Sequence, residues 1–158
     1  STNTTVFKAF KEGSWALLGL TSGWRTVPLT TTDQKIGAST LLNNGNYVVP
    51  SNGIYQIKYE LRMQGVNASL LGSSFIGLIK NGNITTPIEQ KPLDAVNLSL
   101  NLGLVNLDLA SVPITGTTFD TVLQLAQGDT IGLALRTGLD LGVLTEKQVH
   151  VYIYKISD

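Results

Sequence analysis

Apolar residues recur at every second position over much of the chain, and no segment shows a convincing helical period. The pattern is clearest over Ile54–Met63, where the polar positions Gln56, Lys58, Glu60 and Arg62 alternate with apolar ones. These are Tyr55, Ile57, Tyr59, Leu61 and Met63. Alternation with a period of two predicts an antiparallel strand that places one face in a core and the other in water.

Shorter segments with strand character follow along the chain. They are Thr5–Phe10, Ser14–Leu20, Trp24–Leu29, Val96–Leu109, Val122–Leu125, Ile131–Leu135 and Val149–Ile156. In the segment 96–109 the apolar residues change from even-numbered to odd-numbered positions across Val105-Asn106. A β-bulge or a turn produces such a one-residue shift. The last segment is apolar on both faces, which predicts a central position in a sandwich or a place at a subunit interface.

Turn signals separate these segments. Asn44-Gly45 and Asn81-Gly82 suit type I′ hairpins, in which both central residues need a positive φ. Further breaks fall at Pro50–Gly53 and at Gln127–Asp129. We expect Gly53, Gly82 and Gly128 to act as structural turn residues. About eight to ten strands at such spacing predict an all-β sandwich of jelly-roll or Greek-key type.

The length of 158 residues predicts a single domain over 1–158, with residues 1–4 as a frayed terminus. The 11 basic and 11 acidic residues cancel, so no basic excess points to nucleic acid. Only 14% of residues are charged, which favours association. No apolar run is long enough for membrane insertion. The start at Ser1 suggests a mature form or an excised domain.

Catalytic chemistry is hard to assemble from this sequence. It has 0 cysteines and 1 histidine, His150, which lies in an apolar strand where a packing role is preferred. No zinc site or nucleophile motif is found, so no catalytic, cofactor-binding or metal-binding residue is predicted. Carboxylates near predicted loops suit either calcium or, preferably, ordinary turns. These are Asp108, Asp120, Asp129 and Asp140.

The aromatic residues near the N-terminus also allow two interpretations. Phe7, Phe10, Trp15 and Trp24 are expected to pack in the core and at its edges, and the alternative is a surface on which sugar rings stack.

Four segments, in order, resemble the globular head of complement component 1q. They are YVVPSNGIYQIKY at 47–59, GLIKNG at 77–82, VLQLAQGDTI at 122–131 and VYIY at 151–154. Ile57 replaces an aromatic residue usual in vertebrate members, and the Leu-Gly-rich phrases are atypical of them. Both features look more like bacterial members, such as the C-terminal heads of collagen-like spore-surface glycoproteins.

The resemblance implies a ten-stranded jelly roll of the tumour necrosis factor type, assembled as a homotrimer after a fibrous stalk. An extracellular or particle-surface location follows, such as a spore exosporium or a virion fibre. Six tyrosine and leucine residues are predicted to be buried at the subunit interface around the three-fold axis. They are Tyr55, Tyr59, Leu133, Leu135, Tyr152 and Tyr154.

The leading functional hypothesis is therefore a non-enzymatic trimeric head that serves trimerisation and adhesion or recognition. The alternative is a carbohydrate- or receptor-binding tip of a phage or spore fibre, with loops such as 67–74 or Thr85–Lys91 holding the ligand. A hydrolase with distant paired carboxylates is the third hypothesis, and it requires two carboxylates in one concave pocket.

Overall fold

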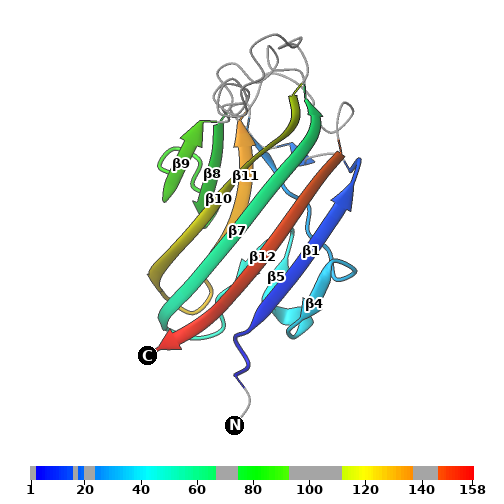
Figure 1. The fold of residues 1–158 in the computed structure, drawn as a ribbon. Helices are drawn as coiled ribbons and strands as arrows, with labels where there is room; N and C mark the ends of the chain where they lie inside the picture. Colours follow the sequence, from blue (N-terminus) through cyan, green and yellow to red (C-terminus); the bar gives the residue numbers. More distant parts are fainter. Residues whose placement is uncertain (1–2, 16–17, 20–23, 67–74, 93–111, 137–145) are drawn as a thin grey trace.

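The structure, a computed structural model, describes residues 3–15, 18–19, 24–66, 75–92, 112–136 and 146–158. These residues form two antiparallel sheets that lie one behind the other (Figure 1). The front sheet, sheet A, has the spatial order β10 (Val112–Leu125), β7 (Gly53–Val66), β12 (Glu146–Ser157), β1 (Phe7–Gly13) and β4 (Gln34–Ile36).

The rear sheet, sheet B, is organised around β11 (Thr130–Arg136). β8 (Phe75–Lys80) pairs along one side of it and carries β9 (Glu89–Pro92) at the edge. β3 (Trp24–Thr26) and β6 (Asn46–Val48) share the other side. Beyond them lie the short strands β2 (Leu18–Gly19) and β5 (Leu42–Asn43), and a 3-10 turn, η2 (Ser39–Leu41), precedes β5.

The long strand β7 organises sheet A because both of its neighbours pair with it over most of their lengths. Tyr59, for example, pairs with Phe119 of β10 on one side and with Val151 of β12 on the other. The alternation predicted for this strand is present: all five apolar positions are buried and face sheet B. Their exposures are Tyr55 0%, Ile57 0%, Tyr59 1%, Leu61 0% and Met63 0%.

The core is the layer of side chains between the two sheets. The inward-facing side chains of sheet B belong to the same buried cluster. They are Tyr47, Ile76, Leu78, Ile131, Leu133 and Leu135. A smaller cluster of Trp24, Ile79 and Ala134 lies on the opposite, outer face of sheet B. Burial of one large apolar side chain stabilises a fold by about 1.5–3 kcal/mol, so the main cluster dominates.

The two hairpin turns have the backbone that their sequences predict. Asn44 and Gly45 have φ of 50° and 83°, and Asn81 and Gly82 have φ of 54° and 69°. Gly128 also has a positive φ, 88°, as its turn requires. Gly53 differs, because it begins β7 rather than forming the turn. A Cβ there would collide with the Lys155 side chain and the Ser157 carbonyl, so close approach explains the glycine.

The jelly-roll sandwich predicted from the sequence is present, with differences in its strands. The described residues hold twelve strands rather than ten, because β2 and β5 are two-residue pairings. The strand expected over Trp24–Leu29 ends at Thr26. Of the strand expected over 14–20, the described part holds only Leu18–Gly19, and the alternating segment 96–109 lies outside the described residues.

Candidate recognition and assembly surface

The outer face of sheet A points away from the core. It carries the alternate side chains of the long strands, namely those that do not face sheet B. Two cross-strand rows show its composition. Tyr154 pairs with Gln56, which pairs with Val122 of β10. In the adjacent row, Tyr152 pairs with Lys58, and Lys58 pairs with Asp120. This face therefore mixes aromatic and aliphatic groups with a few charges.

Four large apolar side chains on these strands are exposed to solvent: Val122 50%, Tyr152 37%, Tyr154 41% and Ile156 49%. β12 thus has one face in the core, where Val149, Val151 and Ile153 are 0% exposed, and one apolar face without cover in the described chain. This explains why the final segment reads as apolar on both sides. We call Val122, Tyr152, Tyr154 and Ile156 the outer apolar set.

Polar contacts hold the rest of this face in place. The Gln56 amide donates to the Asp120 carboxylate, and the Lys8 ammonium lies 5.7 Å from the centre of the Tyr152 ring. Further along, the rings of Phe10 and His150 are 4.6 Å apart. His150 therefore packs against an aromatic neighbour, as its position in an apolar strand predicted.

Four of the six predicted interface residues lie in the core of the single chain, and the prediction is corrected for them. Tyr55, Tyr59, Leu133 and Leu135 are at most 1% exposed, so they have no surface left for a second chain. The Tyr59 hydroxyl donates to the Ile131 carbonyl at 3.2 Å, and burial raises the pKa of this phenol. Only Tyr152 and Tyr154 remain available for an interface.

The sequence interpretation missed Val122 and Ile156 as members of this surface. The available signal was the alternation of side chains along the strand. Val122 lies an odd number of positions from the buried Phe119 and Leu125, so its side chain belongs to the opposite face of β10. Ile156 follows Tyr154 on the same parity of β12, next to a register shift between Lys155 and Ser157.

The N-terminal aromatic residues do not form a common stacking surface. Phe7 and Trp24 are 1% and 3% exposed, and Trp15 packs partly buried against the main core. Phe10 alone lies on the outer face of sheet A, beside His150. Packing in the core and at its edges was the preferred interpretation of these residues, and it holds for Phe7, Trp24 and the partly buried Trp15.

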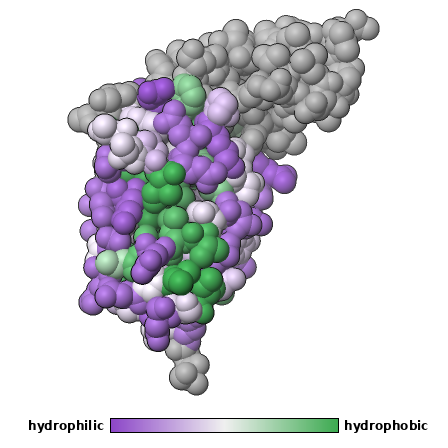
Figure 2. Space-filling model, turned by 90° about the vertical axis from the view of Figure 1, so that its left-hand side faces the viewer, coloured by the Kyte–Doolittle hydropathy of each residue, from purple (hydrophilic) through white to green (hydrophobic). Residues whose placement is uncertain are grey.

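One side of the sandwich brings the edge strands of both sheets together. Lys91 of β9 donates to the Thr118 carbonyl of β10 at 2.6 Å, and its ammonium lies 4.9 Å from the Phe119 ring. Figure 2 shows this side, with apolar residues gathered in a band between polar borders. Among the side chains whose burial is described, Ile88 and Val122, at 36% and 50%, are the exposed large apolar residues in or beside these edge strands.

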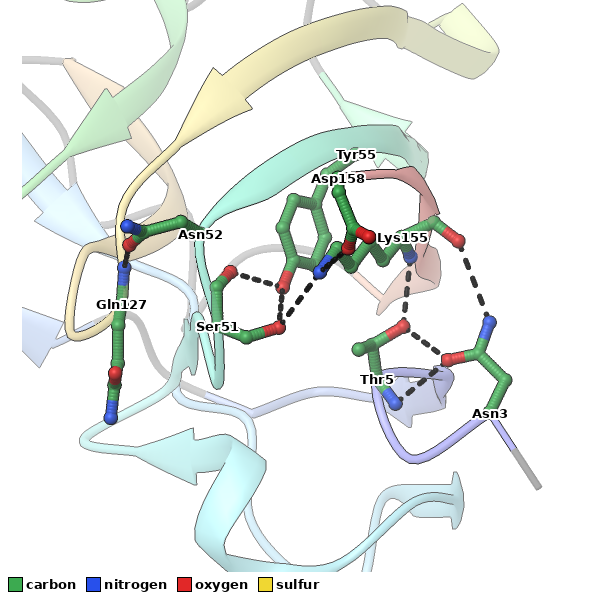
Figure 3. A network of polar contacts seen from close by, with 8 residues as sticks. All are labelled: Asn3, Thr5, Ser51, Asn52, Tyr55, Gln127, Lys155 and Asp158. Carbon is green, nitrogen blue, oxygen red and sulfur yellow. Dashed lines mark hydrogen bonds and ion pairs between the residues drawn. The ribbon is translucent and has the colours of Figure 1, made fainter. Parts of the chain in front are cut away.

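The two ends of the described chain meet at one end of the sandwich (Figures 1 and 3). Asn3, expected in a frayed terminus, accepts hydrogen bonds from the backbone and hydroxyl of Thr5. Thr5 in turn accepts from the Lys155 backbone. The Lys155 ammonium contacts Ser51 at 3.2 Å and Asp158 at 2.7 Å. Both ends of the described chain are thereby tied to the start of β7.

The carboxylates considered for calcium have structural partners where they are described. Asp120 accepts from Gln56, and Asp129 accepts from the Ala126 backbone at 2.8 Å and from Asn81 at 3.0 Å. The Ala126 bond, followed by Asn81, lowers the pKa of Asp129. Asp108 and Asp140 lie outside the described residues. Within the described ranges, no three His, Cys, Asp or Glu side chains gather as metal ligands.

Among the residues that the structure describes, no helix has the length and apolar character needed to cross a membrane.

No protein-family model matches the chain, and none of the curated proteins matches it. Solved structures do match. The globular domain of zebrafish complement 1qA is 13% identical, covers 97% of this chain and 98% of its own, and superposes with a TM-score of 0.57. Pika GITRL is 14% identical over 97% of each chain, with a TM-score of 0.48. Rabbit GITRL is 12% identical, over 74% of this chain and 76% of its own, at 0.41.

The fold thus defines an antiparallel jelly-roll sandwich, and its particular form is that of the complement 1q globular domain. This agrees with the resemblance seen in the sequence. At this level of identity the likeness concerns the fold, so the function has to be argued from the surfaces of this chain.

Proposed function

We propose that this chain is a non-enzymatic trimeric recognition head whose subunits meet through the outer face of sheet A. The observation that carries the proposal is the outer apolar set on neighbouring strands of one sheet. Exposed apolar patches rimmed by polar residues mark association sites in soluble proteins, and tyrosine is enriched there. Tyr152 and Tyr154 supply both features, because each is surrounded by polar neighbours such as Lys58 and Gln56.

Two apolar surfaces that adjoin at Val122 favour a ring over a symmetric dimer. One is the outer face of sheet A, and the other is the β9–β10 edge with its apolar band (Figure 2). Contact of one surface with the other on the next copy is head-to-tail, and such contacts close into rings when the rotation allows it. A ring of three agrees with the homotrimer that the sequence resemblance implies.

The two carboxylates that share a described cavity argue against the hydrolase hypothesis. Asp129 and Asp158 both line a cavity of about 320 Å³ at the chain-end side of the sandwich. A catalytic pair needs environments that push its two pKa values apart, so that one group keeps a proton. Here a backbone hydrogen bond from Ala126 lowers the pKa of Asp129, and Lys155 lowers that of Asp158. Neither group is suited to act as a general acid.

The position of the chain ends supports a head at the tip of a larger surface or fibre protein. The N-terminal segment and the end of β12 are tied together at one end of the sandwich (Figure 3). A stalk joined there, such as a collagen-like one, leaves the opposite end free for adhesion or recognition. This arrangement fits an extracellular or particle-surface location, including the surface of a bacterial spore or a virion.

The alternative function is a tip that binds a glycan or a cell-surface receptor. Of the two loops considered for it, 67–74 lies outside the described residues. In Thr85–Lys91, the side chains of Thr85, Thr86 and Gln90 are exposed and polar.

Analytical ultracentrifugation tests the proposed assembly. Sedimentation equilibrium at micromolar concentration is expected to give a species of three times the 16.9 kDa chain mass. A single species at the mass of one chain over the whole concentration range would overturn the trimeric head.

A further inference from the structure

A small cavity opens on the outer face of sheet B, the sheet that does not carry the outer apolar set. Its volume is about 60 Å³, and its lining includes Thr26, Asn46, Ile79, Gly132 and Ala134. These residues come from β3, β6, β8 and β11, so adjacent strands around β11 build one site. We call it the sheet B cavity.

Small residues of β11 form the floor of the sheet B cavity. Gly132 and Ala134 are both buried and line the cavity. A Cβ at Gly132 would collide with the Asn46 carboxamide, so the glycine allows that amide to lie directly over the floor. The small residue at position 132 thus lets the Asn46 amide approach β11, and the amide lines the cavity beside Ala134.

Thr26 places a hydroxyl at this cavity. The residue is 8% exposed, and within the described ranges its hydroxyl makes no hydrogen bond. The hydroxyl is not one of the fully buried polar atoms without a partner, so it is accessible from the cavity and free to donate to an incoming acceptor.

Asn46 adds a second polar group. Its amide nitrogen donates weakly to the Asn44 carbonyl at 3.4 Å, and its side-chain oxygen accepts no hydrogen bond from the described residues. The hydroxyl of Thr26 and the oxygen of Asn46 together offer one donor and one acceptor.

Aliphatic groups supply the remaining wall. Ile79 and Ala134 are 5% and 1% exposed and belong to the small cluster that includes Trp24. Trp24 is held against Gly77, where an added Cβ would lie 2.9 Å from the indole ring. The wall is therefore fixed by packing, and it is suited to a methyl group.

We propose that the sheet B cavity binds an acetamido group, as carried by N-acetylated sugars. A cavity needs roughly 10–15 Å³ to hold one water molecule, so a volume several times larger has room for a small group of a few heavy atoms. The carbonyl of the acetamido group accepts from the Thr26 hydroxyl, and its N–H donates to the Asn46 oxygen. Its methyl group packs against Ile79 and Ala134. The volume of about 60 Å³ matches this occupant.

The mouth of the cavity favours a sugar as the source of that group. Gly82 lies in the lining, and the turn continues into the exposed polar residues Asn83, Thr85 and Thr86. The Asn83 amide is engaged within this turn, with the Thr86 hydroxyl and the backbone of Thr85 and Thr86. The exposed hydroxyls of Thr85 and Thr86 are therefore the groups that can hydrogen-bond the hydroxyls of a sugar ring. The inference is independent of trimerisation, because the cavity lies on the sheet opposite to the proposed interface.

Ligand-observed NMR on the whole chain tests the proposal with N-acetylglucosamine, glucose and Nε-acetyllysine as probes. We expect N-acetylglucosamine to bind with a Kd of about millimolar, as befits a small buried group, and to show its strongest saturation transfer at the methyl protons. Glucose is expected to bind at least about tenfold more weakly. Equal binding of glucose, or no binding of N-acetylglucosamine, overturns the proposal. Binding of Nε-acetyllysine alone overturns the sugar as the source.

Thr26→Val is the decisive variant because it removes the hydroxyl and keeps the branched shape. It is expected to weaken N-acetylglucosamine binding about fivefold to tenfold, whereas Thr31→Val, at an exposed turn, leaves binding unchanged. Thermal unfolding verifies that both variants fold. Ala134→Leu, which fills the floor, is expected to abolish binding. Unchanged binding in folded Thr26→Val contradicts the assigned role of the hydroxyl.

Discussion

The backbone N–H of Lys155 donates to the hydroxyl of Thr5 at 2.8 Å, although the two residues lie at opposite ends of the chain. The same hydroxyl donates to Asn3 at 2.6 Å, and the Thr5 carbonyl accepts from the buried Tyr47 at 2.8 Å. Thr5 is 6% exposed, so this small residue connects the N-terminal segment, the last strand and the core.

Thr5→Val is expected to destabilise the fold by about 1–3 kcal/mol, because the Lys155 N–H and the Asn3 side-chain oxygen each lose a partner. Urea denaturation at neutral pH measures the change. Thr31→Val, at an exposed turn position, serves as the control and is expected to stay within about 0.5 kcal/mol of the wild type. Equal stability of the two variants would contradict this role of Thr5.

Val122→Lys is expected to shift the proposed trimer towards single chains. A lysine at this half-exposed position brings a charge into the contact but leaves the fold of one chain intact, since surface changes alter stability by only about 0.5 kcal/mol. Sedimentation equilibrium measures the shift. Asn43→Lys, at an exposed position of β5 on the other sheet, adds the same charge and is expected to remain trimeric. A Val122→Lys trimer as stable as the wild type speaks against this face as the interface.

Asp129→Asn is expected to destabilise the fold at neutral pH by about 1–3 kcal/mol, because the carboxylate accepts from Ala126 and Asn81. These bonds lower the pKa of the folded-state carboxyl below its ordinary value of 3.8. A lowered pKa means that the stabilisation is present above that ordinary value and is lost as the pH falls through the folded-state pKa.

The difference between wild type and Asp129→Asn should therefore shrink as acid protonates the carboxylate. Urea denaturation at neutral pH and at a pH of about 2 measures both limits. Glu12→Gln, at an exposed position of β1 without an ion pair among the described residues, controls for the loss of one charge. A difference that is constant with pH would mean that the charge of Asp129 plays no part.

Gly77→Ala is expected to displace the Trp24 ring, because the new Cβ would lie 2.9 Å and 3.0 Å from two of its carbons. Overpacking of this kind costs about 1–3 kcal/mol and should change the tryptophan fluorescence. Trp24→Phe removes the outer part of the ring, so the double variant should lose less stability than the sum of the two single variants. Strict additivity would show that the contact between residues 24 and 77 is unimportant.

The comparison of Tyr59 with Tyr152 illustrates what a pattern can predict. The alternation in β7 and β12 identified which residues share a face, and the structure agrees for both strands. It did not identify which face meets the opposite sheet and which one is left for a partner. That assignment depends on strand pairing, because Tyr59 and Val151 are neighbours across two strands far apart in the chain.

The sheet B cavity gives a second example. No motif links Thr26, Asn46 and Gly132, which come from three strands and meet only because β3 and β6 both pair with β11. Spacing along the chain carries no signal for such a site. The N-terminal aromatic residues, by contrast, attracted attention in the sequence but are mainly core residues.

The sequence by itself determined the strand class, the type I′ turns at Asn44-Gly45 and Asn81-Gly82, and the jelly-roll form. These depend on local rules: a period of two, the positive φ that glycine and asparagine tolerate, and turn spacing. Only the tertiary structure decided that Tyr55, Tyr59, Leu133 and Leu135 are core residues and that Val122 and Ile156 are exposed. Burial is a property of the two packed sheets, so each residue's own neighbours in sequence cannot fix it.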